Sequence, residues 1–279
     1  MAKNVVAMPV IPGQIRRGRF TRPNLAYAKY SMATWRWWCE KNGIEFMVVD
    51  SALGGPAFLD MPPTVKRWLI PELLIRDRSN GTRVAIVDAD TMIRWDAPDF
   101  LASSDAFCAV HGRDRPWISR SIKAFQPLFP GVSLDWQNYF NAGVVVVGER
   151  QLQQLRSFLE FTSNRWPELK AIIHSGNFGT DQTPLNFIMR REKTTLNFLP
   201  TAFNMLHCFP MDPLLFALDN GPSPDPIQFA SHAFGRKDVF SFCKRGYVWH
   251  FSNVVTFRSL VMREVWSRVS HNYPGVLSE

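Results

Sequence analysis

The stretch Arg83-Val-Ala-Ile-Val-Asp-Ala-Asp-Thr-Met-Ile93 decides the fold. Its apolar first half predicts a buried strand over residues 83–88, and that strand ends in two carboxylates, Asp88 and Asp90. In an open α/β sheet, ligands bind beyond the carboxyl ends of the strands. Two acids this close repel each other unless a cation or hydrogen bonds compensate, and a divalent ion bound to diphosphate oxygens would do so. The segment predicts a cation site, and the plainer interpretation is an exposed strand end with a capping aspartate.

Strand and helix signals alternate on both sides of this stretch, which is typical of a parallel α/β sheet. The first helix is predicted over about 24–42, with Asn24 as its N-cap and Gly43 as its stop. Pro62 and Pro63 introduce a second helix. The other predicted elements are strands at 5–11, 44–50, 106–110, 143–148 and 246–251, and helices at about 149–166, 181–191 and from 256. A Pro- and aromatic-rich stretch covers 116–139, and a Pro-rich irregular region covers 210–226.

The composition indicates a folded globular protein with a substantial core. Of its 279 residues 46% are apolar and 20% are charged, which is not the balance of a disordered chain. The formal net charge of +8 suits an anionic ligand such as a nucleotide diphosphate, an acidic glycan or a membrane surface. Because the basic residues are scattered and no nucleic-acid-binding signature occurs, we expect no nucleic-acid partner.

The cysteine spacing and the apolar runs predict a cytoplasmic protein. The four cysteines lie far apart without a Cys-x-x-Cys pair, so free buried thiols are expected rather than zinc ligands or disulfides. No signal peptide is visible, and the longest apolar run, 142–148, is far below the roughly 20 residues of a membrane span. A transmembrane segment is therefore not expected, while peripheral contact with a membrane stays open.

Five further motifs flank Asp88-Ala-Asp90 in a fixed order. They are Lys66-Arg-Trp-Leu-Ile-Pro-Glu-Leu-Leu, Tyr139-Phe-Asn-Ala-Gly-Val-Val-Val-Val, Thr180-Asp-Gln-Thr-Pro-Leu-Asn, Leu199-Pro-Thr-Ala-Phe-Asn and Val248-Trp-His-Phe-Ser. Their joint occurrence over residues 64–252 resembles the GT-A glycosyltransferases, particularly the glycogenin-like and galactosyltransferase group of family 8. The resemblance implies an α/β, Rossmann-like GT-A fold with a mostly parallel central sheet. We expect one domain over 1–279, with a nucleotide-binding half over about 1–150 and an acceptor-side half over about 151–279.

The resemblance also implies a metal site. Asp90 would be a direct ligand, Asp88 would share the metal or hold the donor ribose, and His250 would be the third protein ligand. This mixed set favours Mn²⁺ over Mg²⁺. The ion would neutralise charge on the departing nucleoside diphosphate as a Lewis acid. For His250, which lies between two aromatic residues, the alternative is a core histidine.

Four residues would bind the donor or act in catalysis if the resemblance holds. Arg67 would face the donor phosphates or ribose, unless it lies on a solvated helix face. Asn141 would contact the donor sugar, unless it caps a strand end. Asp181 would hold a sugar hydroxyl and Gln182 would lie beneath the anomeric carbon, although an aspartate at a helix start is also an ordinary N-cap.

One departure from the family concerns the diphosphate. In family 8 the histidine is followed by Gly-x-x-Lys-Pro-Trp, whose lysine contacts the donor diphosphate. Here the chain reads His250-Phe-Ser-Asn-Val-Val-Thr-Phe-Arg258, with neither that glycine nor that lysine. Arg258, Lys244 and Arg245 are alternative substitutes, and the sequence selects none of them.

The leading hypothesis is a metal-dependent transfer of sugar from a UDP-sugar to the hydroxyl of a glycan, protein or small molecule, with retention. A phosphatase with Asp88 as nucleophile is the second hypothesis, although Met92 stands where that pattern needs threonine. A GT-A relative that binds nucleotide-sugar or glycan without catalysis is the third. Trp117 and Trp136 are candidates for stacking on an acceptor sugar, and Arg16-Arg-Gly-Arg19 is either a solvated loop or a phosphate clamp.

Overall fold

The structure is a computed structural model that describes residues 4–10, 25–49, 62–76, 78, 81–176, 178–206, 241–252 and 258–276. The chain divides into two compact units, each made of segments that are discontinuous in sequence. Unit 1 comprises residues 1–23, 44–87 and 99–200, and unit 2 comprises residues 24–43, 88–98 and 201–279. The chain passes from unit 1 to unit 2 between Val87 and Asp88. The expected single domain with halves at 1–150 and 151–279 stays a prediction.

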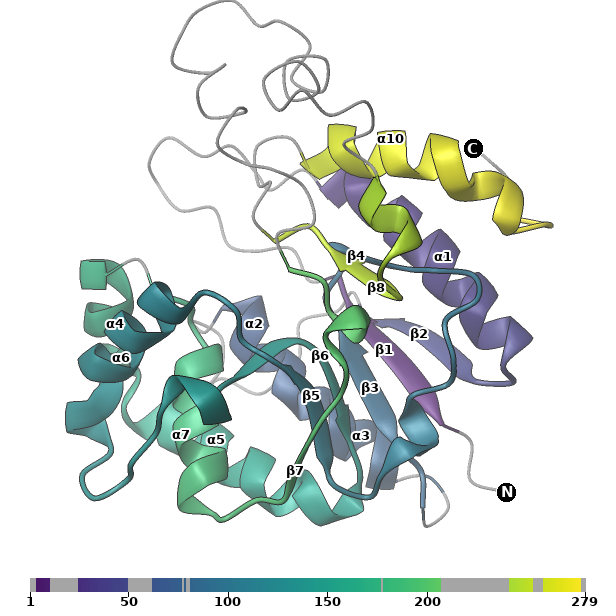
Figure 1. The fold of residues 1–279 in the computed structure, drawn as a ribbon. Coiled ribbons are helices and arrows are strands. Elements are labelled where there is room, and N and C mark those ends of the chain that lie inside the picture. The colour runs from purple at the N-terminus through teal and green to yellow at the C-terminus, as the bar shows by residue number, and fades with distance from the viewer. Residues whose placement is uncertain are drawn as a thin grey trace, which may run out of the picture. The chain divides into compact units, whose positions relative to one another are not determined.

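Unit 1 contains a six-stranded sheet in the order β2-β1-β3-β6-β5-β7 (Figure 1). Its strands are β1 (Val5–Pro9), β2 (Glu45–Val49), β3 (Val84–Val87), β5 (Phe107–His111), β6 (Phe140–Val147) and β7 (Leu196–Phe198). Only β6 runs against its neighbours β3 and β5, whereas β1 pairs in parallel with β2 and β3, and β5 pairs in parallel with β7. The predicted α/β class with a mostly parallel central sheet is confirmed.

The central strands of this sheet are buried on both faces. β3 and β6 are rich in valine, and every residue of β3 is fully buried. Strands covered on both sides have near-continuous apolar runs instead of alternation, which explains why the predicted positions of β1, β3 and β6 match the structure closely. The short β7 was not predicted, because its three residues carry too little pattern.

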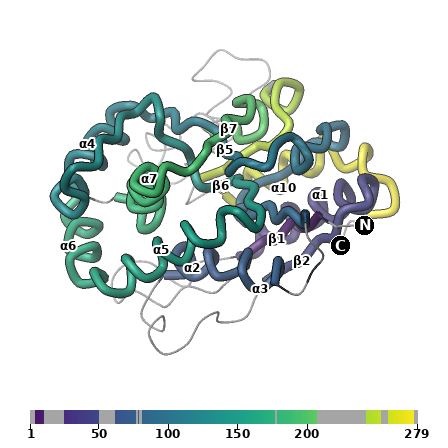
Figure 2. Tube along the Cα trace, turned by 90° about the horizontal axis from the view of Figure 1, so that it is seen from below, coloured from purple at the N-terminus to yellow at the C-terminus, as the bar shows by residue number. Residues whose placement is uncertain are grey.

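Helices cover the sheet of unit 1. They are α2 (Pro63–Lys66), α3 (Ile70–Arg76), α4 (Arg115–Phe125), α5 (Leu152–Asn164), α6 (Trp166–Gly176) and α7 (Gln182–Arg191), with 3-10 turns at Arg67–Leu69, Leu101–Ser103, Gln126–Leu128, Trp136–Asn138 and Glu149–Gln151. Figure 2 shows α2, α3 and α5 along one side of the strands. No helix was predicted in the Pro- and aromatic-rich stretch 116–139, yet α4 occupies its first part, where Asp114 accepts a hydrogen bond from the backbone amide of Trp117 and caps the helix.

Unit 2 is built around a two-stranded antiparallel sheet of β4 (Thr91–Ile93) and β8 (Val248–His250). Its helices are α1 (Ala28–Lys41) and α10 (Arg258–Val269), with 3-10 turns at Leu25–Tyr27, Thr201–Phe203, Ser241–Lys244 and Ser270–Asn272. The helix α1 packs on both β4 and α10. Gly43 adopts φ +66° directly after α1, as the predicted stop requires, and the predicted cap Asn24 lies outside the described residues.

The structure describes three of the four cysteines. Cys39, Cys108 and Cys243 are buried free thiols, as expected, whereas Cys208 lies outside the described residues. The arginine cluster at 16–19 and the Pro-rich stretch 210–226 also lie outside them. Within the part of the chain that the structure describes, no helix combines the length and the apolar character needed to cross a bilayer.

Candidate functional site

Strand pairing in unit 2 brings a histidine beside the two aspartates. After β3 the chain makes a tight turn in which the amide of Thr91 donates to the carbonyl of Asp88, over 3.0 Å. Thr91 then pairs with His250 across β4 and β8, and the amide of Phe251 donates to the carbonyl of Asp90, over 2.9 Å. Because this register is set by backbone hydrogen bonds, the imidazole and the carboxylates face one another.

The side chains of Asp88, Asp90 and His250 form one compact group. The candidate ligand atoms of the three residues all lie within 4.8 Å of one another. The Nε2 atom of His250 lies 3.6 Å from Oδ2 of Asp88 and 3.3 Å from Oδ1 of Asp90. His250 is 3% exposed, whereas the side chain of Asp88 keeps 28% of its surface open to solvent. We call Asp88, Asp90 and His250 the acid–histidine cluster.

Asn204 holds the far side of the imidazole. Its Oδ1 atom lies 2.9 Å from Nδ1 of His250, and Asn204 is completely buried. With Nδ1 held by Asn204, Nε2 is the ring nitrogen that faces the two carboxylates. Sequence reasoning assigned no role to Asn204, although it is the last residue of the quoted Leu199-Pro-Thr-Ala-Phe-Asn motif.

Arg258, the first residue of α10, lies against the acid–histidine cluster. Its Nη2 atom is 3.0 Å from Oδ2 of Asp90, on the opposite oxygen from the one that faces His250. Its Nε donates to the carbonyl of Phe251 over 3.1 Å, and its Nη1 donates to the hydroxyl of Tyr27 over 3.4 Å. Of the three proposed substitutes for the family lysine, Arg258 is thus the one beside Asp90.

The charges of this group reinforce one another. Burial works to raise the pKa of Asp90, but the guanidinium of Arg258 and the nearby His250 outweigh it and hold that pKa well below its ordinary range. Burial likewise works to lower the pKa of Arg258, and the negative charge of Asp90 outweighs it and raises that pKa. Asp90 is therefore an ionised carboxylate, the form in which it can bind a cation.

In unit 1, two of the predicted donor-binding residues meet each other. Asp181 accepts hydrogen bonds on Oδ2 from Nη2 and Nε of Arg67, over 2.7 and 3.2 Å, and from the indole of Trp68, over 2.8 Å. Arg67 is 4% exposed, so the alternative of a solvated helix face is wrong. Asp181 occupies the N-cap position of α7, yet among the described residues its side chain accepts no capping hydrogen bond. We call Arg67, Trp68 and Asp181 the buried carboxylate triad.

Asn141 and Gln182, also in unit 1, secure an irregularity in β6. The register of β5 on β6 shifts between Ala109 and Val110, which leaves a bulge just after Asn141. Oε1 of Gln182 accepts from Nδ2 of Asn141 over 2.9 Å and from the amide of Ala142 over 3.0 Å. Both predicted residues are therefore adjacent, and their amides satisfy backbone groups that the bulge leaves unpaired.

A chain of buried hydroxyls continues from Gln182. Its Nε2 donates to the hydroxyl of Tyr139 over 3.3 Å, and that hydroxyl lies 2.6 Å from Oγ1 of Thr183. Thr183 in turn lies 2.6 Å from the hydroxyl of Ser121. Burial raises the pKa of Tyr139, because the phenolate would lose its hydration. Tyr139 fixes the side chain of Gln182 without reaching the surface, and sequence reasoning missed this role.

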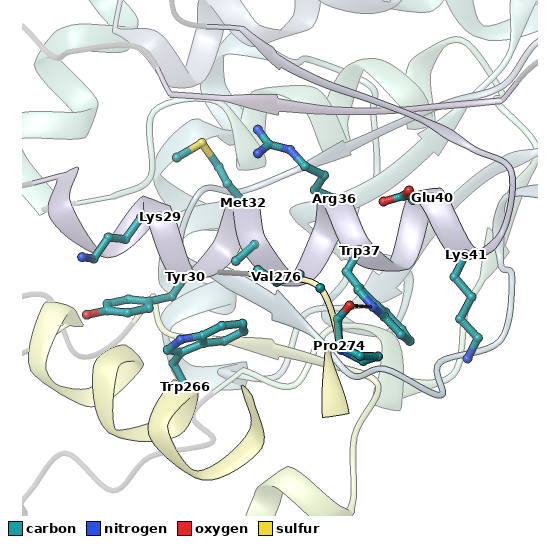
Figure 3. Close-up of a pocket in the computed structure, with 12 residues that line it drawn as sticks. Lys29, Tyr30, Met32, Arg36, Trp37, Glu40, Lys41, Trp266, Pro274 and Val276 are labelled. Carbon is teal, nitrogen blue, oxygen red and sulfur yellow. Dashed lines mark hydrogen bonds between the residues drawn. The ribbon is translucent and has the colours of Figure 1, made fainter. Parts of the chain in front are cut away.

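A groove of about 750 Å³ runs along α1 in unit 2, between that helix and the C-terminal residues (Figure 3). Lys29, Tyr30 and Trp37 line it, and the indole of Trp37 donates to the carbonyl of Pro274 over 3.2 Å. None of the acid–histidine cluster lines this groove, so it is a separate feature.

The two predicted acceptor tryptophans lie in unit 1 and differ in exposure. Trp117 stands edge-on to Phe178, with 6.2 Å between the ring centroids. Trp136 is 38% exposed, and the guanidinium of Arg115 lies over its ring at 4.8 Å. Stacking of either ring on an acceptor stays a prediction.

No family model matches the chain, and no curated protein matches it in sequence. Solved structures are similar to it at low identity. A glycosyltransferase involved in the glycosylation of the major capsid of PBCV-1 has a TM-score of 0.46 and 12% identity, over 94% of this chain and 99% of that one. The glycosyltransferase GlyE of Streptococcus pneumoniae has a TM-score of 0.41 and 13% identity, over 100% of this chain and 67% of that one. Mouse xyloside xylosyltransferase 1 has a TM-score of 0.41 and 11% identity, over 91% of this chain and 99% of that one.

Proposed function

We propose that the chain is a metal-dependent glycosyltransferase that moves a sugar from a UDP-sugar to an acceptor hydroxyl with retention of anomeric configuration. The observation that carries the proposal is the convergence of Asp88, Asp90 and His250. His250 lies far along the chain from the two acids, and the resemblance to the glycosyltransferases implied that these three side chains would share one ion. Convergence of a distant imidazole on an acidic pair is a stronger signal than an Asp-x-Asp sequence alone.

The residues of the acid–histidine cluster fit a divalent cation. They offer two carboxylates and one imidazole within 4.8 Å of one another, a set that suits Mn²⁺ better than Mg²⁺ because Mg²⁺ prefers oxygen ligands alone. Asn204 orients the imidazole as outer partners of metal-bound histidines do. When bound, the cation supplies Lewis-acid stabilisation of the charge that develops on the leaving diphosphate.

Within unit 2, the protein's own part in the reaction is to hold this ligand set in place. Asp88 and Asp90 contribute fixed negative charge at the end of β3, where a nucleotide's diphosphate and cation are bound in open α/β sheets. With a cation bound, Asn204 would accept a hydrogen bond from Nδ1 of His250, which would leave Nε2 available as a ligand. Contacts of this kind within the protein lower the cost of organising a binding site.

Within unit 1, we propose that Asn141 and Asp181 bind the donor sugar, that Gln182 lies beneath its anomeric carbon, and that Arg67 faces the donor phosphates or ribose. In the buried carboxylate triad Oδ2 of Asp181 takes all three hydrogen bonds, so its Oδ1 is the oxygen we assign to a sugar hydroxyl. Gln182, held by Asn141 and Tyr139, is a rigid polar group and a poor nucleophile. We therefore favour a front-face reaction over a covalent intermediate on Gln182. The acceptor is a hydroxyl of a glycan, a protein or a small molecule.

Cation and nucleotide titrations test the proposal directly. Calorimetry of the full chain with UDP and GDP, each with and without Mn²⁺, is expected to show UDP binding that depends on Mn²⁺. In Asp90→Asn this binding is expected to weaken on the order of a hundredfold or more, because a charged ligand to the ion is lost. Asp96→Asn is the matched control, since Asp96 belongs to the same unit, pairs with Arg94 and is half exposed. Equal Mn²⁺ binding by Asp90→Asn and the wild type would refute the metal assignment.

Turnover is tested with a panel of nucleotide-sugars and Mn²⁺, by following slow donor hydrolysis or transfer to added acceptors. Binding of Mn²⁺ and UDP with no turnover under any condition would favour a recognition module that binds nucleotide-sugar. Release of phosphate from simple esters with Mg²⁺, without nucleotide binding, would favour the phosphatase with Asp88 as its nucleophile. Either result overturns the transferase.

A further inference from the structure

Arg258 gives the acid–histidine cluster a counter-ion of its own. The guanidinium lies 3.0 Å from Oδ2 of Asp90, and its side chain is only 16% exposed. Carbonyls of Phe251 and Ser252 and the hydroxyl of Tyr27 accept its other donors, over 3.1, 3.3 and 3.4 Å. An arginine held by this many partners is a built feature and not a surface side chain that happens to lie nearby.

The charge count around this arginine depends on what is bound. Two carboxylates and one guanidinium leave a single net negative charge when His250 is neutral. A divalent cation on its own would turn that into a single net positive charge, and it would lie close to the guanidinium, which repels it. A diphosphate carries at least two negative charges, so the single net positive charge of the cation-loaded cluster attracts it, and the guanidinium adds to that attraction. The guanidinium thus acts in opposite directions on a bare cation and on a diphosphate.

We propose that Arg258 couples the two ligands: it weakens the binding of a divalent cation alone and strengthens the binding of a nucleoside diphosphate once the cation is present. In the absence of the diphosphate, Arg258 neutralises Asp90. When the diphosphate binds, its oxygens compete with Asp90 for the same guanidinium, because arginine binds phosphate as well as carboxylate in a bidentate manner. This inference rests on the proposed function, since it presupposes that the cluster binds a cation and a diphosphate.

The structure distinguishes Arg258 from the other basic residues of its region. Lys244 and Arg245 are exposed, and Arg263 on the same helix is turned to solvent beside Glu264. The side chain of Arg263 is 59% exposed. A charge there is largely screened by water and salt, so it should not affect either ligand.

The test compares Arg258→Met with Arg263→Met as the matched control, using Mn²⁺ and UDP. Free Mn²⁺ is followed by its electron paramagnetic resonance signal, and UDP binding by calorimetry with and without Mn²⁺. In Arg258→Met we expect Mn²⁺ alone to bind on the order of tenfold more tightly, and UDP with Mn²⁺ present to bind on the order of tenfold more weakly. The factor by which Mn²⁺ strengthens UDP binding and the factor by which UDP strengthens Mn²⁺ binding should fall equally, because linkage is reciprocal.

Opposite shifts for the two ligands are the result that a purely structural role would not produce. Arg258→Lys keeps the charge and is expected to keep most of the coupling. If Arg258→Met does not fold, Arg258→Gln replaces it, because it retains a donor for Asp90 without the charge. Changes of the same sign for both ligands, or a variant that behaves like Arg263→Met, would overturn the inference while leaving the proposed function intact. A wild-type chain that binds neither Mn²⁺ nor UDP would overturn both.

Discussion

The buried carboxylate triad of unit 1 supports a prediction that does not depend on any assigned activity. The side chains of Arg67 and Asp181 are 5% and 6% exposed, and Oδ2 of Asp181 takes three hydrogen bonds. Removing one partner from a buried ion pair leaves an uncompensated charge and typically costs about 3–5 kcal/mol of unfolding free energy. We expect a loss of this size in Arg67→Met, because Asp181 then keeps only the indole of Trp68 from the triad.

The second arm of the experiment removes the other charge. Asp181→Asn retains the shape and one acceptor oxygen, so we expect a smaller loss of about 1.5–3 kcal/mol, the range for hydrogen bonds to charged groups. In the double variant no buried charge lacks a partner. The sum of the two single losses should therefore exceed the loss in the double variant by about 2 kcal/mol.

Urea unfolding followed by far-ultraviolet circular dichroism measures these differences. Tryptophan fluorescence is unsuitable, because the indole of Trp68 is itself a member of the triad. Glu168→Gln is the control. Nε of Arg165 lies 3.0 Å from Oε1 of Glu168, and the side chains of Arg165 and Glu168 are 42% and 49% exposed. That exposed pair should contribute only about 0.2–1 kcal/mol. Additive losses in the double-mutant cycle, to within about 0.5 kcal/mol, would refute the coupling that we infer for Arg67 and Asp181.

Asn204→Ala is expected to weaken Mn²⁺ binding by about 10–100-fold, because His250 loses the partner that orients it, whereas Asn204→Asp keeps an acceptor and should retain most of the affinity; unchanged Mn²⁺ titrations in the alanine variant would contradict this. The raised pKa of Tyr139 means that the unfolded chain loses this proton first, so its stabilising contribution is complete below about pH 10 and declines at higher pH by up to about 1.4 kcal/mol per pH unit. Tyr139→Phe should flatten that decline in urea titrations at alkaline pH, and identical slopes would argue against it. Arg83 is 6% exposed, and its Nε and Nη1 find no hydrogen-bond partner among the described residues. Arg83→Met should therefore leave the midpoint of thermal unfolding unchanged or raise it, and a loss of more than about 1 kcal/mol would show that the guanidinium contributes more than its visible contacts suggest.

Local sequence pattern was sufficient for the elements whose signal is strong. The apolar runs of β1, β3 and β6 and the Gly43 stop of α1 were predicted within a few residues, because a strand buried on both faces and a left-handed glycine each leave a direct mark. The weak elements failed for the opposite reason. Only the Asp114 cap marks α4 within a Pro- and aromatic-rich stretch, and β7 has just three residues.

The residues of the acid–histidine cluster were found from the sequence, but their contacts were not. Side-chain chemistry and motif order selected Asp88, Asp90 and His250, and the resemblance placed them on one ion. Only the tertiary structure decided that the guanidinium of Arg258 faces Asp90. Contacts between residues this far apart in the chain depend on the pairing of β4 with β8 and on where α10 begins. The partner of Asp181 depends likewise on tertiary packing. A carboxylate at a helix start can cap the backbone or bind a distant guanidinium. In this structure Asp181 binds the guanidinium of Arg67 and does not cap α7.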